Sequence, residues 1–270
     1  MYQNFVRYID ITKTVMIKII YAFIALMSLT SCVSSYDIEG TSNITMLDGR
    51  MLYLKVYDNN ELKTLDSCDV VHGQFKFTGT VDSVRYAMLF MDNEGLMPVV
   101  LEDGKIHVNI DKTRQNAGGT PLNDKLSGFM EKYIQLTNRI NELGREQSRA
   151  IMDGSDMDAV NMRLAKEADR IAEKEDKLVT SFIVDNFDNV LGPGIFFMMT
   201  ADNTYPELSP WVEDIMSKAT DKFKSDPYVK DYYEKACHNQ NIMNGMSSHD
   251  VNAPLPATGA PTPNELARPR

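Results

Sequence analysis

The hydrophobic pattern of the chain changes near Gly119. Before that point, apolar and polar residues alternate in short segments, most clearly over residues 50–57 and 105–111. A period of two is typical of strands that bury one face and expose the other. After that point, apolar residues recur every three or four positions over long stretches, as in amphipathic helices. The sequence therefore predicts a β-rich domain over residues 37–112 and a helical domain over residues 120–240.

Clusters of turn-forming residues separate the alternating segments. Gly, Asp and Asn tolerate the backbone dihedrals of tight hairpin turns. They gather at residues 48–49, 58–60, 72–73, 92–95 and 103–104. This spacing predicts about six or seven short antiparallel strands, arranged as a β-sandwich or an open barrel.

Two long helices are expected to open the second half. The first begins at Thr120-Pro121, a cap followed by proline, and ends near Asp153-Gly154. Its apolar seam consists of Leu122, Leu126, Phe129, Tyr133, Leu136, Ile140 and Leu143. The second helix begins at Ser155, and Glu175 is the one interruption of its apolar stripe. Two such helices joined by a tight turn form an antiparallel hairpin, whose seams pack against each other and the sheet, or which projects as a dimerisation arm.

The rest of the helical half reads as shorter helices and a tail. Gly192-Pro193-Gly194 is expected to end the second long helix, and a short buried helix follows it. Ser209-Pro210 and Asp226-Pro227 open two further helices that end near Cys237. Residues 241–270 are rich in proline and poor in apolar residues, so we expect a disordered tail. The fold class is thus α+β: an antiparallel β-sandwich or open barrel, then a helical region with a long antiparallel hairpin.

A short apolar run near the N-terminus ends in a cysteine. Residues 19–27 are apolar, and Leu29-Thr30-Ser31-Cys32 follows them. The run is shorter than the roughly 20 residues that span a bilayer, so it fits the apolar region of a cleaved signal. This arrangement resembles the lipobox of bacterial lipoproteins.

The lipobox resemblance implies that a diacylglyceryl group is attached to the Cys32 thiol. It makes residues 1–31 a signal peptide, with Met16 as the true start, and residues 32–36 a lipidated tether. The alternative is a buried helix or an uncleaved anchor that begins near Met16. Val33 follows the cysteine in place of the aspartate associated with inner-membrane retention. The expected location is therefore the cell envelope, at the outer membrane, on either of its faces.

The charge of the chain limits the classes of partner. Cleavage after Ser31 would remove three basic residues and one acidic residue, taking the formal net charge from −10 to −12. A surface this acidic repels phosphate backbones and anionic headgroups. We therefore expect no nucleic-acid partner, and attachment to the membrane through acyl chains instead of a basic patch.

Several short motifs recur in a familiar order. They are Ile38-Glu39-Gly40, Leu47-Asp48-Gly49, residues 73–79, residues 101–104 and residues 119–124. Together they resemble the domain-of-unknown-function family 4369, over roughly residues 38–240. The resemblance implies a β-rich module with a helical extension, in lipid-anchored envelope proteins that commonly continue into a thioredoxin-like domain.

The chain departs from that family pattern in one respect. A thioredoxin-like domain needs a Cys-x-x-Cys pair, and the sequence contains none. We therefore interpret the chain as the family's module without its enzyme, with no catalytic residue and no cofactor. The leading hypothesis is a lipid-anchored, non-catalytic envelope module that binds a partner protein or a second copy of itself.

Cysteine, histidine and methionine residues supply two alternative functions. Cys68 and Cys237 either pair in a disulfide or remain two unpaired thiols, and a free thiol would suit an accessory of thiol–disulfide exchange that acts with a separate thioredoxin-like protein. Soft ligands gather near the tail, where they would suit Cu(I) if they are not simply part of a linker. These candidate ligands are Cys237, His238, Met243, Met246 and His249.

Other histidines and acids have simpler interpretations. His72 lies in a turn and is expected to serve its backbone conformation. His107 alternates with apolar neighbours and is expected to face solvent. Asp153, Asp156 and Asp158 lack the spacing of a calcium loop, so we expect them to cap a helix.

Overall fold

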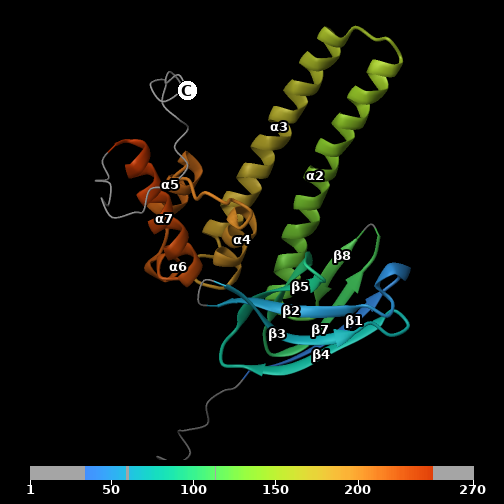
Figure 1. Cartoon of the computed structure of the whole chain (residues 1–270), viewed down its shortest axis with the longest axis vertical. Helices are drawn as coiled ribbons and strands as arrows, with labels where there is room; N and C mark the ends of the chain where they lie inside the picture. The colour runs from blue at the N-terminus through green and yellow to red at the C-terminus, as the bar shows by residue number, and fades with distance from the viewer. Residues whose placement is uncertain (1–33, 59–60, 113, 246–270) are drawn as a thin grey trace, which may run out of the picture.

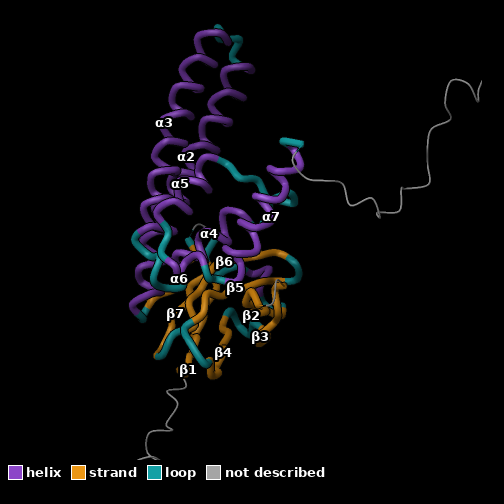
Figure 2. The backbone as a smooth tube through the Cα atoms, turned by 90° about the vertical axis from the view of Figure 1, so that its left-hand side faces the viewer, coloured by secondary structure: helices purple, strands orange, loops and turns teal. Residues whose placement is uncertain are grey.

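The computed structural model describes residues 34–58, 61–112 and 114–245. Within these ranges the chain forms two facing β-sheets and a set of helices on one side of the sandwich (Figures 1 and 2). A long helical hairpin extends away from this body (Figure 1). The predicted α+β class, a β-sandwich followed by helices, is confirmed.

Eight strands are found in the described ranges. They are β1 (Ser34–Ser42), β2 (Met51–Asp58), β3 (Glu61–Asp69), β4 (Gln74–Val81), β5 (Arg85–Met91), β6 (Glu94–Leu101), β7 (Gly104–Ile110) and β8 (Gln115–Gly118), with a short 3-10 helix η1 (Thr45–Leu47) after β1. Their order is β4-β1-β7-β8 in one sheet, named sheet A here, and β3-β2-β5-β6 in the other, named sheet B. The sheets stay separate, so the sandwich, and not the barrel, is the arrangement formed by the described strands.

One strand pair contradicts the prediction of an all-antiparallel sandwich. β1 and β7 run parallel, with Ile38 opposite Ile106. β1 also pairs antiparallel with β4, which makes it a central strand of sheet A. Alternation reveals which side chains share a face, and this is the same for either strand direction. The local pattern therefore carried no information on the direction of this pair.

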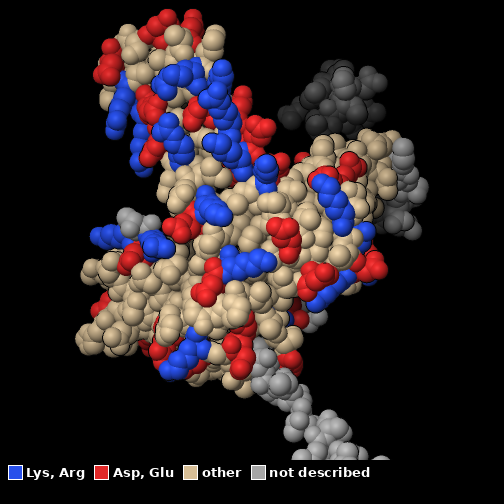
Figure 3. Space-filling view, turned by 180° about the vertical axis from the view of Figure 1, so that it is seen from behind, with Lys and Arg blue, Asp and Glu red and all other residues tan. Residues whose placement is uncertain are grey.

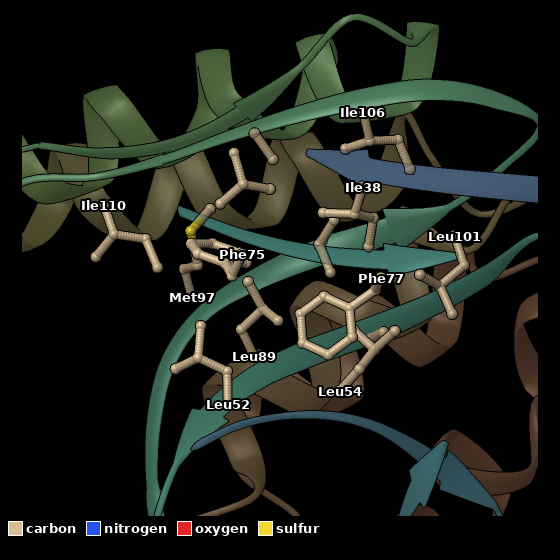
Figure 4. Close-up of a cluster of buried hydrophobic side chains, with 14 of the residues drawn as sticks. Ile38, Leu52, Leu54, Phe75, Phe77, Leu89, Met97, Leu101, Ile106 and Ile110 are labelled. Carbon is tan, nitrogen blue, oxygen red and sulfur yellow. The ribbon is translucent and has the colours of Figure 1, made fainter. Parts of the chain in front are cut away.

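Apolar side chains from the two sheets meet between them and form the sandwich core (Figure 4). Ile38, Phe77 and Ile106 project from sheet A, and Leu54 and Leu89 project from sheet B. Each of these side chains is at most 1% exposed. Burial of a side chain of this size stabilises a fold by about 1.5–3 kcal/mol. The alternating segments therefore supply the core of the sandwich.

Two aromatic rings of this core lie over glycines of the neighbouring strand. Phe75 lies opposite Gly40, and Tyr36 lies opposite Gly79, in the β1–β4 ladder. A Cβ atom at Gly40 would lie 2.1 Å from the Phe75 ring, and one at Gly79 would lie 2.5 Å from the Tyr36 hydroxyl oxygen. Only a residue without a side chain permits so close an approach. These glycines, which end two of the motifs described above, therefore have a packing role.

The helices are α2 (Pro121–Met152), α3 (Met157–Val184), α4 (Leu191–Thr200), α5 (Pro210–Lys218), α6 (Asp221–Lys224) and α7 (Pro227–Met243). α2 and α3 form the expected antiparallel hairpin (Figure 1). Ser209 and Asp226 cap α5 and α7 with their side chains, and proline follows each cap. In the part of the chain that the structure describes, no helix is both long enough and apolar enough to cross a bilayer.

The bounds of α3 differ from the prediction at both ends. The helix begins after Asp156 instead of Ser155, because the Asp156 carboxylate accepts hydrogen bonds from the backbone N–H groups of Asp158 and Ala159. It ends at Val184, before Gly192-Pro193-Gly194. That tripeptide lies in the first turn of α4, where proline costs no helical hydrogen bond.

The hairpin is held by its own apolar seam and by charges of both signs. Leu143 of α2 packs with Leu164 and Ile171 of α3. Figure 3 shows acidic and basic side chains intermixed over the hairpin, and Arg163 of α3 pairs with Glu146 of α2 at 3.2 Å. Glu175, the predicted interruption, lies near Tyr133, and its carboxylate adds to the effect of burial in raising the pKa of that phenol.

Buried polar side chains join the base of α2 to β6, the edge strand of sheet B. The Val100 N–H donates to Asn123 Oδ1 at 2.9 Å, and Asn123 Nδ2 donates to the Val100 carbonyl at 2.8 Å. Glu102 Oε1 accepts from the N–H groups of Leu122 and Asn123, at 2.8 and 3.0 Å. Asn123 thus bonds β6 as a neighbouring strand would, while Glu102 satisfies N–H groups at the start of the helix.

Candidate binding groove between sheet B and the helices

A groove runs between the outer face of sheet B and helices α4 and α7. It consists of a cavity of about 300 Å³ and a neighbouring one of about 850 Å³. The two cavities adjoin, because five residues line both of them: Tyr57, Leu62, Met88, Phe197 and Tyr228. Alternation alone would predict that the outer face of sheet B is exposed to solvent, but helices α4 and α7 partly cover it.

Strand geometry explains how the sheet side of the groove arises. Leu54 and Val56 of β2 and Leu89 of β5 are buried in the sandwich core. Successive residues of a strand point to opposite faces, so Tyr57 and Met88 point outward. The outward face of β2 and β5 thus presents aromatic and thioether groups to the helices.

Three aromatic rings form the floor of the groove. Tyr228 of α7 meets Tyr57 of β2 edge-on, with ring centroids 4.9 Å apart, and it meets Phe197 of α4 at the same separation. Tyr57 and Phe197 lie 5.4 Å apart. Edge-to-face pairs at such distances add about 0.5–1.5 kcal/mol each beyond their buried area. The cluster therefore couples the sandwich to two helices at one point.

Hydrogen bonds orient the tyrosines of α7. Thr200 Oγ1 donates to the Phe196 carbonyl at 2.7 Å and lies 2.9 Å from the Tyr228 hydroxyl. Because the Thr200 proton is already used, the Tyr228 hydroxyl is the donor in the second bond. Asn203 Nδ2 donates to the Tyr232 hydroxyl at 3.4 Å. The loop after α4 is thus tied to α7 along the larger cavity.

Burial and nearby carboxylates keep the groove phenols protonated. Burial raises the pKa of Tyr228 to about 12, and it raises the pKa of Tyr57, where the Asp231 carboxylate adds to the effect. Burial also raises the pKa of Asp226, although two backbone N–H bonds oppose that shift. The phenols are therefore hydrogen-bond donors throughout the physiological range.

The smaller cavity contains a buried phenol. The Tyr86 ring lies against Gly194, where a Cβ atom would come within 2.2 Å of it. Its hydroxyl group is fully enclosed, and among the described residues it has no hydrogen-bond partner. Burial raises the pKa of this phenol. Together with Arg85 and Asp58, which lie 3.8 Å apart, Tyr86 gives this end of the groove its polar groups.

The candidate residues chosen from sequence lie elsewhere. Cys68 is on β3 and Cys237 is on α7, and both are free thiols instead of the disulfide considered above. His72 has a positive φ of 52° in the β3–β4 turn, and His107 is exposed on β7. Cys32, Met246 and His249 lie outside the described residues, as do the signal peptide and most of the tail.

The proposed soft-metal ligands do not share a helix face. α7 continues to Met243, beyond the end predicted near Cys237, so Cys237, His238 and Met243 are helical. Neighbouring helical residues point about 100° apart, and residues five positions apart also diverge. No group of three or more Cys, His, Asp or Glu side chains placed to hold a metal occurs over the described part of the chain.

The Cys68 thiol is expected to resist alkylation. Burial, followed by the carboxylates of Asp66 and Asp69, raises its pKa from 9.0 to about 11, against one opposing backbone hydrogen bond. Two pKa units lower the thiolate fraction at pH 8 by about a hundredfold. Iodoacetamide labelling of a Cys237→Ser variant between pH 7 and 11, followed by mass spectrometry, should show a rate that climbs across the whole interval. The same thiol in urea is the control, and a plateau below pH 9 in the folded chain would contradict the expectation.

The comparisons with known proteins bear on the first half of the chain. The search of curated proteins finds no match. A family model described as Domain of unknown function (DUF4369) matches residues 36–126. The match takes in all of the sandwich strands except the start of β1, and it stops in α2 at Leu126, within the resemblance drawn over residues 38–240. Residues 36–126 of the chain are therefore a DUF4369 domain, as their motifs indicated.

Proposed function

We propose that the chain is a lipid-anchored, non-catalytic module of the cell envelope that binds a partner protein in the groove. The observation that carries the binding role is the aromatic floor made by Tyr57, Phe197 and Tyr228. Aromatic side chains with a few oriented polar groups are characteristic of binding sites and of the centres of protein interfaces. The sequence Leu29-Thr30-Ser31-Cys32 supports the anchor, and Val33 after the cysteine supports placement at the outer membrane.

The arrangement of the fold suits such an anchor. β1 begins at Ser34, two residues after Cys32, at the end of the molecule opposite the tip of the hairpin (Figures 1 and 2). Acyl chains on Cys32 would hold the sandwich beside the membrane and direct the hairpin away from it. α2 has 32 residues, which corresponds to a length of about 48 Å. The groove, at the base of the hairpin, would remain open to a partner at the membrane surface.

The thiol–disulfide alternative receives less support. An attacking thiol works as the thiolate, and reactive cysteines have depressed pKa values. Burial moves the pKa of Cys68 in the opposite direction, to about 11. Three of the five candidate Cu(I) ligands diverge around α7, and Met246 and His249 lie outside the described residues. Neither alternative is therefore proposed.

Replacing Cys32 with serine is expected to release the protein from the membrane. Several acyl chains give stable anchoring, and a serine hydroxyl does not accept them in this linkage. Fractionation of cells should move the variant from the membrane pellet to the soluble fraction, and mass spectrometry should find no lipid on it. A Cys237→Ser chain is the control and should stay in the pellet. A Cys32→Ser chain that still sediments with membranes would contradict the proposed lipid anchor.

Partner binding is tested in the same cells with a photo-reactive residue at Phe90, which lines the larger cavity. We expect an intermolecular product that weakens when Cys32 is replaced, because the chain then leaves the membrane surface. The same photo-reactive residue at Val71, which is 58% exposed and lies outside the groove, should not give this product. A product of twice the chain's mass would identify the partner as a second copy. Equal products from both positions would speak against the groove.

A further inference from the structure

The groove has the features of a site for an extended, proline-rich segment. Aromatic-lined grooves receive polyproline II helices, whose preformed conformation lowers the entropy cost of binding. The rings of Tyr57, Phe197 and Tyr228 lie at one level of the groove, and Phe90 lies farther along it. Two joined cavities along one helix favour an elongated ligand over a compact one.

The polar groups of the groove match the chemistry of such a segment. A polyproline II helix makes no internal hydrogen bonds, so its carbonyl groups need external donors. Proline supplies no N–H group, so few acceptors are required in return. The Tyr57 phenol lines both cavities, and burial raises its pKa, so its hydroxyl group is a donor at physiological pH.

The chain contains a segment of this kind after α7 in the sequence. Residues 253–263 read Ala-Pro-Leu-Pro-Ala-Thr-Gly-Ala-Pro-Thr-Pro and follow α7, whose residues line one wall. Lys235 is the last residue of α7 that lines the groove, and it comes eight residues before the end of the helix at Met243. Those eight residues correspond to about 12 Å of helix. The ten residues between Met243 and Pro254 extend to about 35 Å, so the segment can fold back to the groove.

We propose that residues 253–263 occupy this groove as a polyproline II segment and compete there with the partner protein. The inference rests on the proposed function in taking the groove as the partner's site. Occupation by the chain's own tail would lower the apparent affinity for a partner by the fraction of time that the groove is filled. Release of the tail would then open the site.

The first test is a cross-linking experiment on the purified full chain in detergent. With a photo-reactive residue at Phe90, we expect an intramolecular product that proteolysis and mass spectrometry map to residues 253–263. Substituting Pro254, Pro256, Pro261 and Pro263 together by alanine should abolish that product. The same photo-reactive residue at Val71 should not reach the segment. A product at Phe90 that maps elsewhere, or one that survives the four substitutions, would overturn the proposal.

The second test measures affinity with a synthetic peptide of residues 251–264. The peptide is titrated into the full chain that carries the four alanine substitutions, and binding is followed by fluorescence anisotropy of a dye on the peptide. A peptide with the same four alanine substitutions should bind about tenfold to a hundredfold more weakly, because each proline removes entropy from the free chain. Equal affinities, or no binding of the proline peptide, would refute tail docking.

These outcomes separate the two proposals. Loss of the intermolecular product in cells, with the intramolecular product intact, counts against the partner protein alone. An intermolecular product without an intramolecular one counts against the tail alone.

Discussion

Replacing Asn123 with alanine is expected to destabilise the chain by roughly 3 kcal/mol, because it leaves buried backbone groups without partners. Asn123 is fully buried, and its amide holds both the N–H and the carbonyl of Val100. Strand β6 is the edge of sheet B, so no other strand of that sheet can take over these bonds. Urea unfolding followed by circular dichroism should show an earlier midpoint.

Two comparison variants sharpen this prediction. Asn138→Ala, at an exposed position of α2, should change the unfolding free energy by less than about 0.5 kcal/mol. Asn123→Asp keeps the size of the side chain but places a second carboxylate beside Glu102, whose Oε1 lies 3.3 Å from Asn123 Nδ2. It should be at least as destabilising as alanine. If Asn123→Ala and Asn138→Ala unfold at the same urea concentration, the buried hydrogen bonds of Asn123 do not contribute to the free energy of unfolding as predicted.

Replacing Gly40 with alanine is expected to destabilise the sandwich by about 2–3 kcal/mol through overpacking. The new Cβ would lie 2.1 Å from the Phe75 ring, which is itself only 5% exposed and has little room to move. Thermal unfolding should show a lower midpoint. A Gly40→Ala, Phe75→Leu double variant should show a smaller loss than the two single changes added together, since the smaller side chain relieves the contact.

Gly128→Ala is the matched control for that change. Gly128 lies within α2, and a Cβ there would meet no atom within 4 Å. Alanine should stabilise the chain at this position by about 0.5–1 kcal/mol, because it favours the helix over the unfolded state. If Gly40→Ala were as stable as Gly128→Ala, the packing of the Phe75 ring would not require glycine at position 40.

The sequence carried enough information for the core faces and most helix starts. Alternation over residues 50–57 predicted the buried face that carries Leu54, and cap-plus-proline pairs marked α5 and α7. The bond between Asn123 and Val100 was not predictable, because 23 residues separate the partners and a lone asparagine carries no signal. The parallel direction of the β1–β7 pair was not predictable either, because alternation is the same for either strand direction.

The groove was missed because its residues were assigned to a wet face. Tyr57 and Phe90 occupy alternate positions on the outer side of sheet B, where polar residues would be expected. Aromatic residues at such positions were the available signal that another layer covers the strand. Their partners Phe197 and Tyr228 lie more than 100 positions later, so local patterns could not pair them.

The central place of β1 has a mechanical consequence for an anchored protein. A pull between the membrane and a partner on the helices would enter the domain at Ser34, along the axis of β1. β1 is hydrogen-bonded to β4 on one side and to β7 on the other. Both sets of hydrogen bonds would therefore have to break together before the strand slides out. An edge strand under the same force would lose only one ladder. A pull on the tethered end should therefore unfold the sandwich only at a higher force than would be needed if the first strand lay at the edge of its sheet.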